Sequence, residues 1–292
     1  MVPELVETGI HEVFGSRVHA ESVKTAGGGC INTCYAVSLS NGITIFVKEN
    51  TSSFTGLFKA ESKGLKELGQ AGGPKVPRVL HYRDDGKTQL LFLEYLESGP
   101  KPKGFYEHFG RGMAELHRNS MKKGFGFETD NHIGSTVQYN PRKDTWLDFF
   151  VSARITPQKE MAEKRGLLPA DVIRGIDQFI GRIGSVLLDD DTGSLIHGDL
   201  WGGNYMCDGK EAVLIDPAVS YSHREADLAM TELFGGFSEA FYGAYREAFP
   251  LDPGYEDRID AYNLYHMLNH LNIFGTGYLG SVASILRKYG CL

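Results

Sequence analysis

One segment constrains this chain more than any other: Leu-Ile-His-Gly-Asp-Leu-Trp-Gly-Gly-Asn over 195–204, followed by Val-Leu-Ile-Asp-Pro over 213–217. A short apolar run leads to a carboxylate at Asp199, an amide follows five residues later at Asn204, and a second apolar run leads to a carboxylate at Asp216. One carboxylate can orient and deprotonate a hydroxyl group, and an amide with a carboxylate can hold magnesium through oxygen atoms. The segment therefore predicts an enzyme that transfers a phosphoryl group, with Asp199 as the catalytic residue and Asn204 and Asp216 as metal ligands.

Composition narrows the class of protein. The 292 residues, 41% of them hydrophobic and 23% charged, suffice for a core and two lobes of an ordinary globular protein. A net charge of -7 offers no basic excess for a nucleic-acid partner. The N-terminus lacks the pattern of a signal peptide, and no apolar run is long enough to span a bilayer. Four cysteines, too few for a disulfide framework, favour a reducing cytoplasm: Cys30, Cys34, Cys207 and Cys291.

The chain divides into a strand-rich part and a helix-rich part. A turn over 38–42 predicts a hairpin of strands 33–39 and 43–49, and a second turn over 84–87 leads into a strand over 90–96. One helix is expected at about 54–68 between these hairpins. Apolar periodicity predicts further helices over 105–117, 145–154, 171–188, 226–234 and 258–272. Because 97–102 is a Gly/Pro connector, we expect an α+β protein with a small antiparallel β-rich lobe over 1–97 and a larger helical lobe over 98–292.

Several small-lobe residues are candidates for binding a nucleotide. Gly27, Gly28 and Gly29 precede a strand, where backbone N–H groups can approach phosphate oxygens, although a glycine cluster is more often a plain turn. Lys48 ends a strand, and Glu61 lies on the apolar stripe of the next helix. A buried carboxylate needs a cation, so the two are expected to pair and to hold the lysine against phosphates. A solvated lysine and an exposed glutamate are the alternatives.

Other candidates come from the connector and the large lobe. The backbone of Glu94, Tyr95 and Leu96 is placed to hydrogen-bond an adenine edge at a hinge. Trp201 can form one wall of a sugar-binding site, although core packing would also explain it. His197 is expected to be structural, and Asp227 to accept hydrogen bonds from the catalytic-loop backbone.

These residues resemble the fructosamine kinase family, also called ketosamine-3-kinases, within the aminoglycoside phosphotransferase and choline kinase-like group. The resemblance covers nearly the whole chain. Its most specific parts are the 197–204 motif with its tryptophan, Asp216-Pro217, and the segments 221–229, 234–237 and 268–275. It implies a protein-kinase-like fold and ATP-dependent, magnesium-requiring phosphorylation of the sugar 3-hydroxyl of ketosamines. The product is unstable and releases the amine, so the activity amounts to protein deglycation.

The resemblance also implies roles for further residues. His270 would lie on the substrate side with Trp201, and Cys30 of the nucleotide loop becomes a candidate redox switch beside the alternative of an inert thiol. The chain would be a monomer or a redox-linked homodimer, acting on a free or protein-bound ketosamine. The compact chain is more similar to bacterial members of the family than to vertebrate ones, which implies a preference for ribulosamine or erythrulosamine adducts over fructosamine adducts. Two alternatives stay open: a kinase for another hydroxylated amine, of the aminoglycoside or choline type, and a catalytically silent nucleotide-binding regulator.

Overall fold

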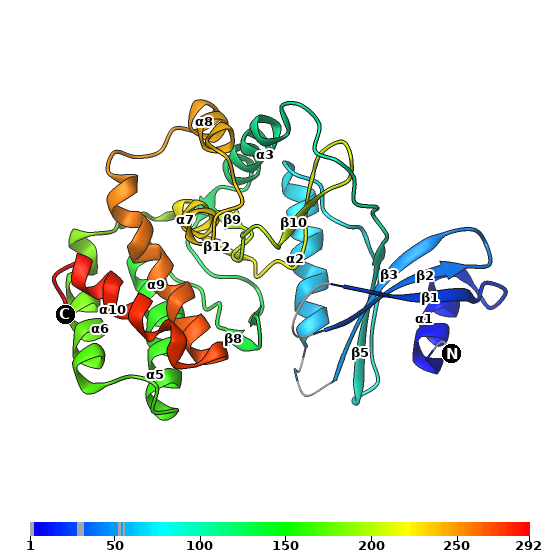
Figure 1. Ribbon diagram of the computed structural model, residues 1–292, viewed down its shortest axis with the longest axis horizontal. Coiled ribbons are helices and arrows are strands. Elements are labelled where there is room, and N and C mark those ends of the chain that lie inside the picture. Colours follow the sequence, from blue (N-terminus) through cyan, green and yellow to red (C-terminus); the bar gives the residue numbers. More distant parts are fainter. Residues whose placement is uncertain (1–2, 28–31, 52–53, 55) are drawn as a thin grey trace.

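The computed structural model describes residues 3–27, 32–51, 54 and 56–292 (Figure 1). The first part of the chain contains α1 Glu4–Phe14, β1 Ala20–Ala26, β2 Thr33–Leu39, β3 Thr44–Thr51, α2 Leu57–Ala71, β4 Val79–Asp84 and β5 Thr88–Glu94. The second part begins with α3 Phe105–Asn119, β6 Lys122–Lys123, β7 Asn131–Ile133, β8 Thr136–Gln138, α4 Trp146–Phe150, a π-helical turn Val151–Ile155, α5 Thr156–Lys164 and α6 Ala170–Arg182. It continues with β9 Thr192–Ile196, β10 Tyr205–Cys207, β11 Ala212–Leu214, β12 Ser220–Ser222, α7 Glu225–Leu233, α8 Glu239–Ala248, α9 Tyr255–Phe274 and α10 Leu279–Lys288. The predicted α+β class is confirmed.

An antiparallel sheet of order β1-β2-β3-β5-β4 forms the centre of the first part. Successive residues of a strand face opposite sides of a sheet. Leu90 and Phe92 of β5 accordingly pack in one core with α1, whereas Leu91 and Leu93 pack in another with α2. Lys48 of β3 pairs with Leu91 in register, on the side that faces α2. Strand alternation therefore points Lys48 towards the helix that carries Glu61.

The structure shifts the predicted helix over 54–68. Gly56 and Gly72 both have positive φ, 71° and 83°, and α2 runs between them from Leu57 to Ala71. Glycine adopts this backbone conformation without steric cost, so the two glycines define the helix ends. Glu61 is consequently in the second turn of α2.

Other boundaries also differ from the sequence prediction. The helix expected over 145–154 is split into α4 and the π-helical turn, and the one over 171–188 ends as α6 at Arg182, followed by a 3-10 turn. The apolar period on which the prediction of this helix rests matches its buried side, which includes Val172, Ile176 and Phe179. Periodicity missed several elements, among them α1, β1, α5, α8 and α10.

The hairpin β10–β11 lies against one segment of the first part and against the connector between the two parts. Leu214 N donates to Lys75 O at 2.8 Å, and Gly99 N donates to Cys207 O at 2.8 Å. Because Asn204 precedes this hairpin and Asp216 follows it, both predicted metal ligands flank the place where the two parts join. Leu68 of α2 packs in the same core as Tyr205 of β10 and Leu214 of β11.

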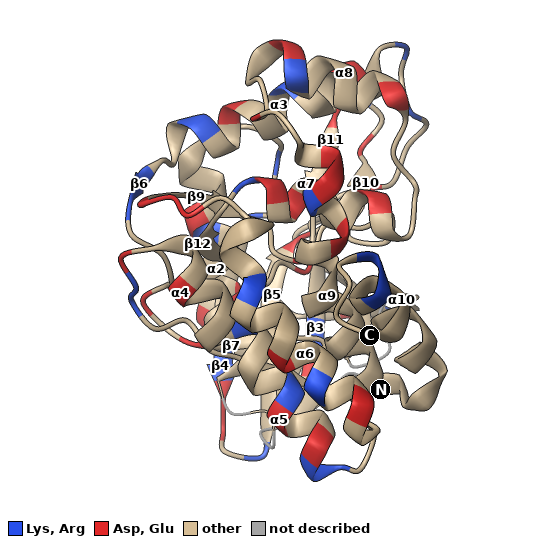
Figure 2. Ribbon diagram, turned by 90° about the vertical axis from the view of Figure 1, so that its left-hand side faces the viewer, with Lys and Arg blue, Asp and Glu red and all other residues tan. Residues whose placement is uncertain are grey.

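Acidic and basic residues are interspersed on the helices in Figure 2. Within the described part of the chain, no helix has the length and apolar character needed to cross a bilayer.

Candidate active site

Lys48 and Glu61 form the predicted ion pair. Lys48 Nζ lies 2.5 Å from Glu61 Oε1 and also pairs with Asp216 Oδ1. The Lys48 and Glu61 side chains are 6% and 10% exposed, which excludes the alternatives of a solvated lysine and a surface glutamate. Burial alone would lower the pKa of Lys48, but the carboxylates of Asp216 and Glu61 outweigh it and raise that pKa. The pair therefore keeps a permanent cation beside Asp216.

Asp199 and Asn204 face each other across a tight loop. Asn204 Nδ2 donates to Asp199 O at 2.8 Å and to Asp199 Oδ2 at 2.9 Å. This arrangement leaves the amide oxygen of Asn204 as the atom suited to a metal ion. Burial raises the pKa of Asp199 to about 7, and the hydrogen bond from Asn204 opposes part of that rise.

A buried carboxylate of α7 fixes the backbone of this loop through hydrogen bonds. Asp227 of α7 accepts hydrogen bonds from His197 N at 2.7 Å and Gly198 N at 2.8 Å. His117 of α3 lies 3.2 Å from the same carboxylate and 2.8 Å from the hydroxyl of Tyr245. Gly198 has φ +82°, and a Cβ there would lie 2.1 Å from Ala218 O. The geometry agrees with structural roles for His197 and Asp227.

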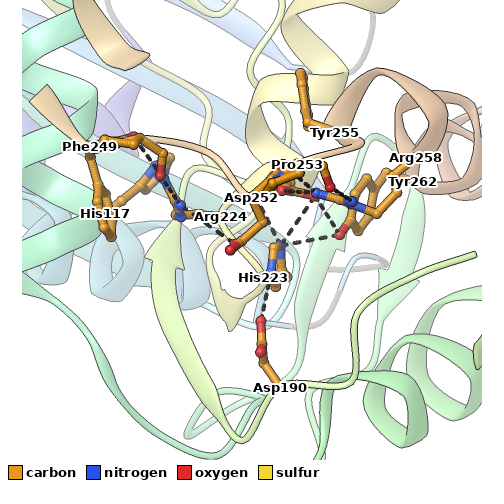
Figure 3. A network of polar contacts seen from close by, with 12 residues as sticks. His117, Asp190, His223, Arg224, Phe249, Asp252, Pro253, Tyr255, Arg258 and Tyr262 are labelled. Atoms are coloured by element: carbon orange, nitrogen blue, oxygen red, sulfur yellow. Dashed lines mark hydrogen bonds and ion pairs between the residues drawn. The ribbon is translucent and has the colours of Figure 1, made fainter. Parts of the chain in front are cut away.

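A second polar network fixes the start of α7 (Figure 3). Arg258 of α9 donates to both oxygens of Glu225, at 2.7 and 2.6 Å. His223 Nε2 lies 2.8 Å from Asp190 Oδ2, and its Nδ1 is 3.2 Å from the hydroxyl of Tyr262. Ligand atoms of His223, Glu225 and Asp252 lie within 4.8 Å of one another, but Arg258 already supplies the positive charge. The cluster anchors α7 and with it Asp227.

The backbone at Asp216 adopts an unusual conformation. Its φ of +55° is the only positive value at a non-glycine residue in the described part of the chain. Such a conformation persists only where the surroundings hold it in place. His197 Nε2 donates to Ile215 O at 2.9 Å on one side, and Gln138 Nε2 donates to Ala218 O at 2.9 Å on the other.

The hairpin β7–β8 is a part of the site that sequence reasoning missed. Asn131 Nδ2 donates to Val219 O at 2.8 Å, and Thr136 Oγ1 donates to Asn269 Oδ1 at 2.6 Å. Its polar side chains Asn131, Thr136, Gln138 and Asn140 are buried, so no apolar period marks the hairpin in the sequence.

Six candidate residues line one cavity of about 220 Å³, namely Glu61, Asp199, Trp201, Asn204, Asp216 and His270, whereas Lys48 lies behind its wall, paired with Glu61 and Asp216. Its wall combines residues from both parts of the chain: Asn32, Leu57, Glu61, Asn131–Gly134, Asp199, Trp201, Asn204, Asp216–Ala218, Asn269, His270, Ile273 and Phe274. Trp201 is 40% exposed, which argues against the alternative of core packing. His270 lies between the rings of Phe234 and Tyr278, with both centroids at 5.0 Å.

The hinge residues and Gly27 lie elsewhere. Glu94, Tyr95 and Leu96 are not among the residues that line this cavity, and Glu94 N donates to Arg78 O at 2.9 Å. β5 ends at Glu94, so Tyr95 and Leu96 follow the strand. Gly27 is exposed, and Gly28, Gly29 and Cys30 lie outside the described residues. The adenine, phosphate-loop and redox predictions stay predictions.

The fructosamine kinase family model matches residues 2–290. The chain belongs to the fructosamine kinase family. A "probable ketoamine kinase" of Synechocystis is 37% identical over 283 residues, which cover 96% of this chain and 94% of the relative. The chloroplastic protein-ribulosamine 3-kinase of Arabidopsis thaliana is 36% identical, covering 94% of this chain and 84% of the relative.

Solved structures agree with the family assignment. The crystal structure of a "putative fructosamine-3-kinase" of Thermobifida fusca has a TM-score of 0.87 at 32% identity, covering 97% of each chain. An amicoumacin kinase, with a TM-score of 0.59 at 15% identity over 92% of this chain and 87% of its own, shows the fold alone. The predicted protein-kinase-like fold is confirmed, and membership makes the protein an ATP-dependent phosphotransferase. A kinase of this family implies ATP with a metal ion, and the oxygen ligands of Asn204 and Asp216 suit a hard divalent cation.

Proposed function

We propose that this fructosamine kinase family member phosphorylates the sugar 3-hydroxyl of ketosamines and thereby leads to deglycation. The observation that carries the proposal is the convergence of Asp199, Asn204 and Asp216 on one cavity, with the buried Lys48 bonded to Asp216. Curated relatives carry ketoamine or ribulosamine kinase names. The alternatives of an aminoglycoside or choline type of kinase and of a silent regulator are not favoured.

Each polar residue has a proposed role. Asp199 orients the acceptor hydroxyl and takes its proton, and Asn204 Nδ2 holds that carboxylate in place. Lys48, fixed by Glu61, contacts the phosphates of ATP. Asn204 and Asp216 would hold Mg²⁺, which when bound neutralises phosphate charge.

The substrate side of the cavity supports the choice of acceptor. Trp201 presents an exposed aromatic ring, and sugar rings stack their C–H faces on such surfaces. His270 Nδ1 donates to His266 O at 2.8 Å, which fixes the imidazole at the cavity wall. We propose that these two side chains contact the ketosamine.

Three finer assignments stay proposals. We place the boundary between the nucleotide-binding lobe and the catalytic lobe at residues 97 and 98. The cytoplasm is the proposed location, and the acceptor is a free or protein-bound ketosamine.

The test is a coupled assay of ADP release with ribuloselysine, fructoselysine, choline and kanamycin side by side. We expect turnover with the two ketosamines and none above background with the others. Asp199→Asn should lower kcat by roughly 10²- to 10⁴-fold while leaving the melting temperature nearly unchanged. Turnover of choline or kanamycin alone would replace the proposed acceptor, and a fully active Asp199→Asn enzyme would remove the proposed base.

A further inference from the structure

A second, smaller cavity lies behind the catalytic loop. The cavity has a volume of about 20 Å³, which is room for one or two water molecules or a small ion. Its wall includes Gly198 of the catalytic loop and consists almost entirely of buried residues: Gln138, Trp146, Phe150, Arg154, Ile196, Ser220, Ser222, Ala226, Tyr262, Tyr265 and His266. Of the active-cavity residues named above, none lines it.

Arg154 brings a buried positive charge to this cavity. The residue is 4% exposed, and its hydrogen bonds in the described part of the chain go to neutral acceptors. These acceptors are Tyr139 O at 2.5 Å, Ala153 O at 3.1 Å, Asn140 Oδ1 at 2.8 Å and Ser220 Oγ at 3.0 Å. Burial lowers the pKa of Arg154 to about 10, so the side chain remains charged at neutral pH. A buried charge is costly without a counter-charge.

Two further polar atoms of the wall have no partner among the described residues. They are Trp146 Nε1 and His266 Nδ1, whose residues are 1% and 5% exposed. An indole N–H can only donate a hydrogen bond. Ser220 Oγ and Ser222 Oγ, 2.8 Å apart, share one hydrogen bond and add a hydroxyl donor. The wall is therefore rich in donors.

Carboxylates near the cavity are engaged elsewhere. Glu225 contacts the hydroxyl of Tyr262 but is bound at both oxygens by Arg258. Asp130 raises the pKa of Arg154 at a distance but forms no ion pair with it within the described residues. No carboxylate is part of the described cavity wall.

We propose that this cavity binds a small monovalent anion of the size of chloride, held by Arg154, Trp146 and the serine hydroxyls. The anion supplies the missing counter-charge and an acceptor for the orphaned indole N–H. Because Gly198 lines the cavity, binding also supports the catalytic loop. The proposal is independent of the acceptor that the kinase uses.

Bromide provides the direct test, because it replaces chloride and scatters X-rays anomalously. Crystals of the full chain grown in bromide should show an anomalous peak between Arg154, Trp146 and Ser220. The position of this peak decides the proposal. A map without a peak in the cavity overturns it and leaves water as the occupant, whatever the salt does to stability.

Thermal unfolding provides the second measurement. At constant ionic strength, chloride in place of gluconate should raise the melting temperature by roughly 3 °C through binding to the folded state. Trp146→Phe keeps an aromatic side chain but removes the indole N–H, so the chloride response should fall at least twofold, and Arg154→Met should abolish it. Arg174→Met, at an exposed position of α6, is the matched control and should respond like the wild type. An unchanged response in Trp146→Phe contradicts the assigned donor.

Discussion

At the scale of single residues, the site depends on charges kept away from water. Lys48 is buried between two carboxylates, and Asp216 holds a backbone conformation that few non-glycine residues adopt. Removing one partner of a buried ion pair leaves the other charge uncompensated, which costs more than removing both.

Lys48→Met should destabilise the folded protein by about 3 kcal/mol, because Glu61 remains buried without a cation. Adding Glu61→Gln should recover at least half of that loss, while both variants stay inactive. Urea unfolding and ADP release are the measurements, and Lys24→Met on the exposed side of β1 is the control, expected within about 0.5 kcal/mol of wild type. If Glu61→Gln recovers no stability, the buried pair is not the cause of the loss.

His197 should make stability depend on pH. Its Nδ1 accepts from Asp199 N at 3.3 Å and its Nε2 donates to Ile215 O, so the fold fits the neutral ring. Burial lowers the pKa of His197, although the charges of Asp227 and Asp216 oppose this. The unfolded chain then binds the proton first. Stability from this residue is present above about pH 6.5 and is lost as pH falls, at about 1.4 kcal/mol per pH unit.

The measurement is urea unfolding between pH 5.5 and 7.5. His197→Asn can still accept from Asp199 N but does not titrate. The slope of its free energy of unfolding against pH should therefore be smaller than that of the wild type by the equivalent of about one proton. Equal slopes of unfolding free energy against pH in the two proteins would show that the pKa of His197 is the same in the folded and the unfolded chain.

At the scale of elements, the short hairpin β7–β8 links several walls of the site. Its buried amides bind the carbonyl groups of Ala218 and Val219, two and three residues after Asp216. It also packs against α2, the helix that carries Glu61. The hairpin therefore positions the segment that follows the proposed metal ligand Asp216.

Gln138→Leu should raise the magnesium concentration needed for half-maximal activity several-fold, because Ala218 O loses its donor. The effect on the KM for the ketosamine should be smaller. Val137 directly precedes Gln138 in β8 and is 41% exposed. The control variant Val137→Ala should leave the magnesium dependence unchanged. An equal shift in every kinetic constant would indicate general loosening instead of positioning.

The sequence predicted those elements whose residues follow a helical or strand period or contain a recognisable turn motif. The pairing of Lys48 with Glu61 followed from a carboxylate on an apolar stripe, and the 33–39/43–49 hairpin from its Asn-Gly turn. β7–β8 was missed because its strands have three residues each and its buried side chains are polar. The helix over 145–154 was predicted as one piece because a π-helical turn leaves the apolar pattern nearly unchanged. Hydrogen bonds between residues far apart in the chain determine the structure at these two positions.

At the scale of the whole molecule, the hairpin β10–β11 joins the two parts of the chain. It pairs with Lys75 on one side and with Gly99 on the other, and Lys75 Nζ lies 3.1 Å from Asp208 Oδ2. Asn204 and Asp216 flank this hairpin, so the relative position of the two parts sets the distance between Lys48 and the proposed metal ligands.

Gly99→Ala tests this coupling. A Cβ at Gly99 would lie 2.7 Å from Gly209 Cα and 2.8 Å from Gly209 N, and backbone atoms cannot yield as a flexible side chain does. We expect about 1–3 kcal/mol of destabilisation and a raised KM for ATP, because the first part must shift relative to the hairpin. Gly181→Ala in α6, where a Cβ meets nothing within 4 Å, should instead stabilise by about 0.5–1 kcal/mol. Calorimetry and ATP titration distinguish the two variants: lost stability with an unchanged KM would mean that the contact holds the fold together without setting the geometry of the site.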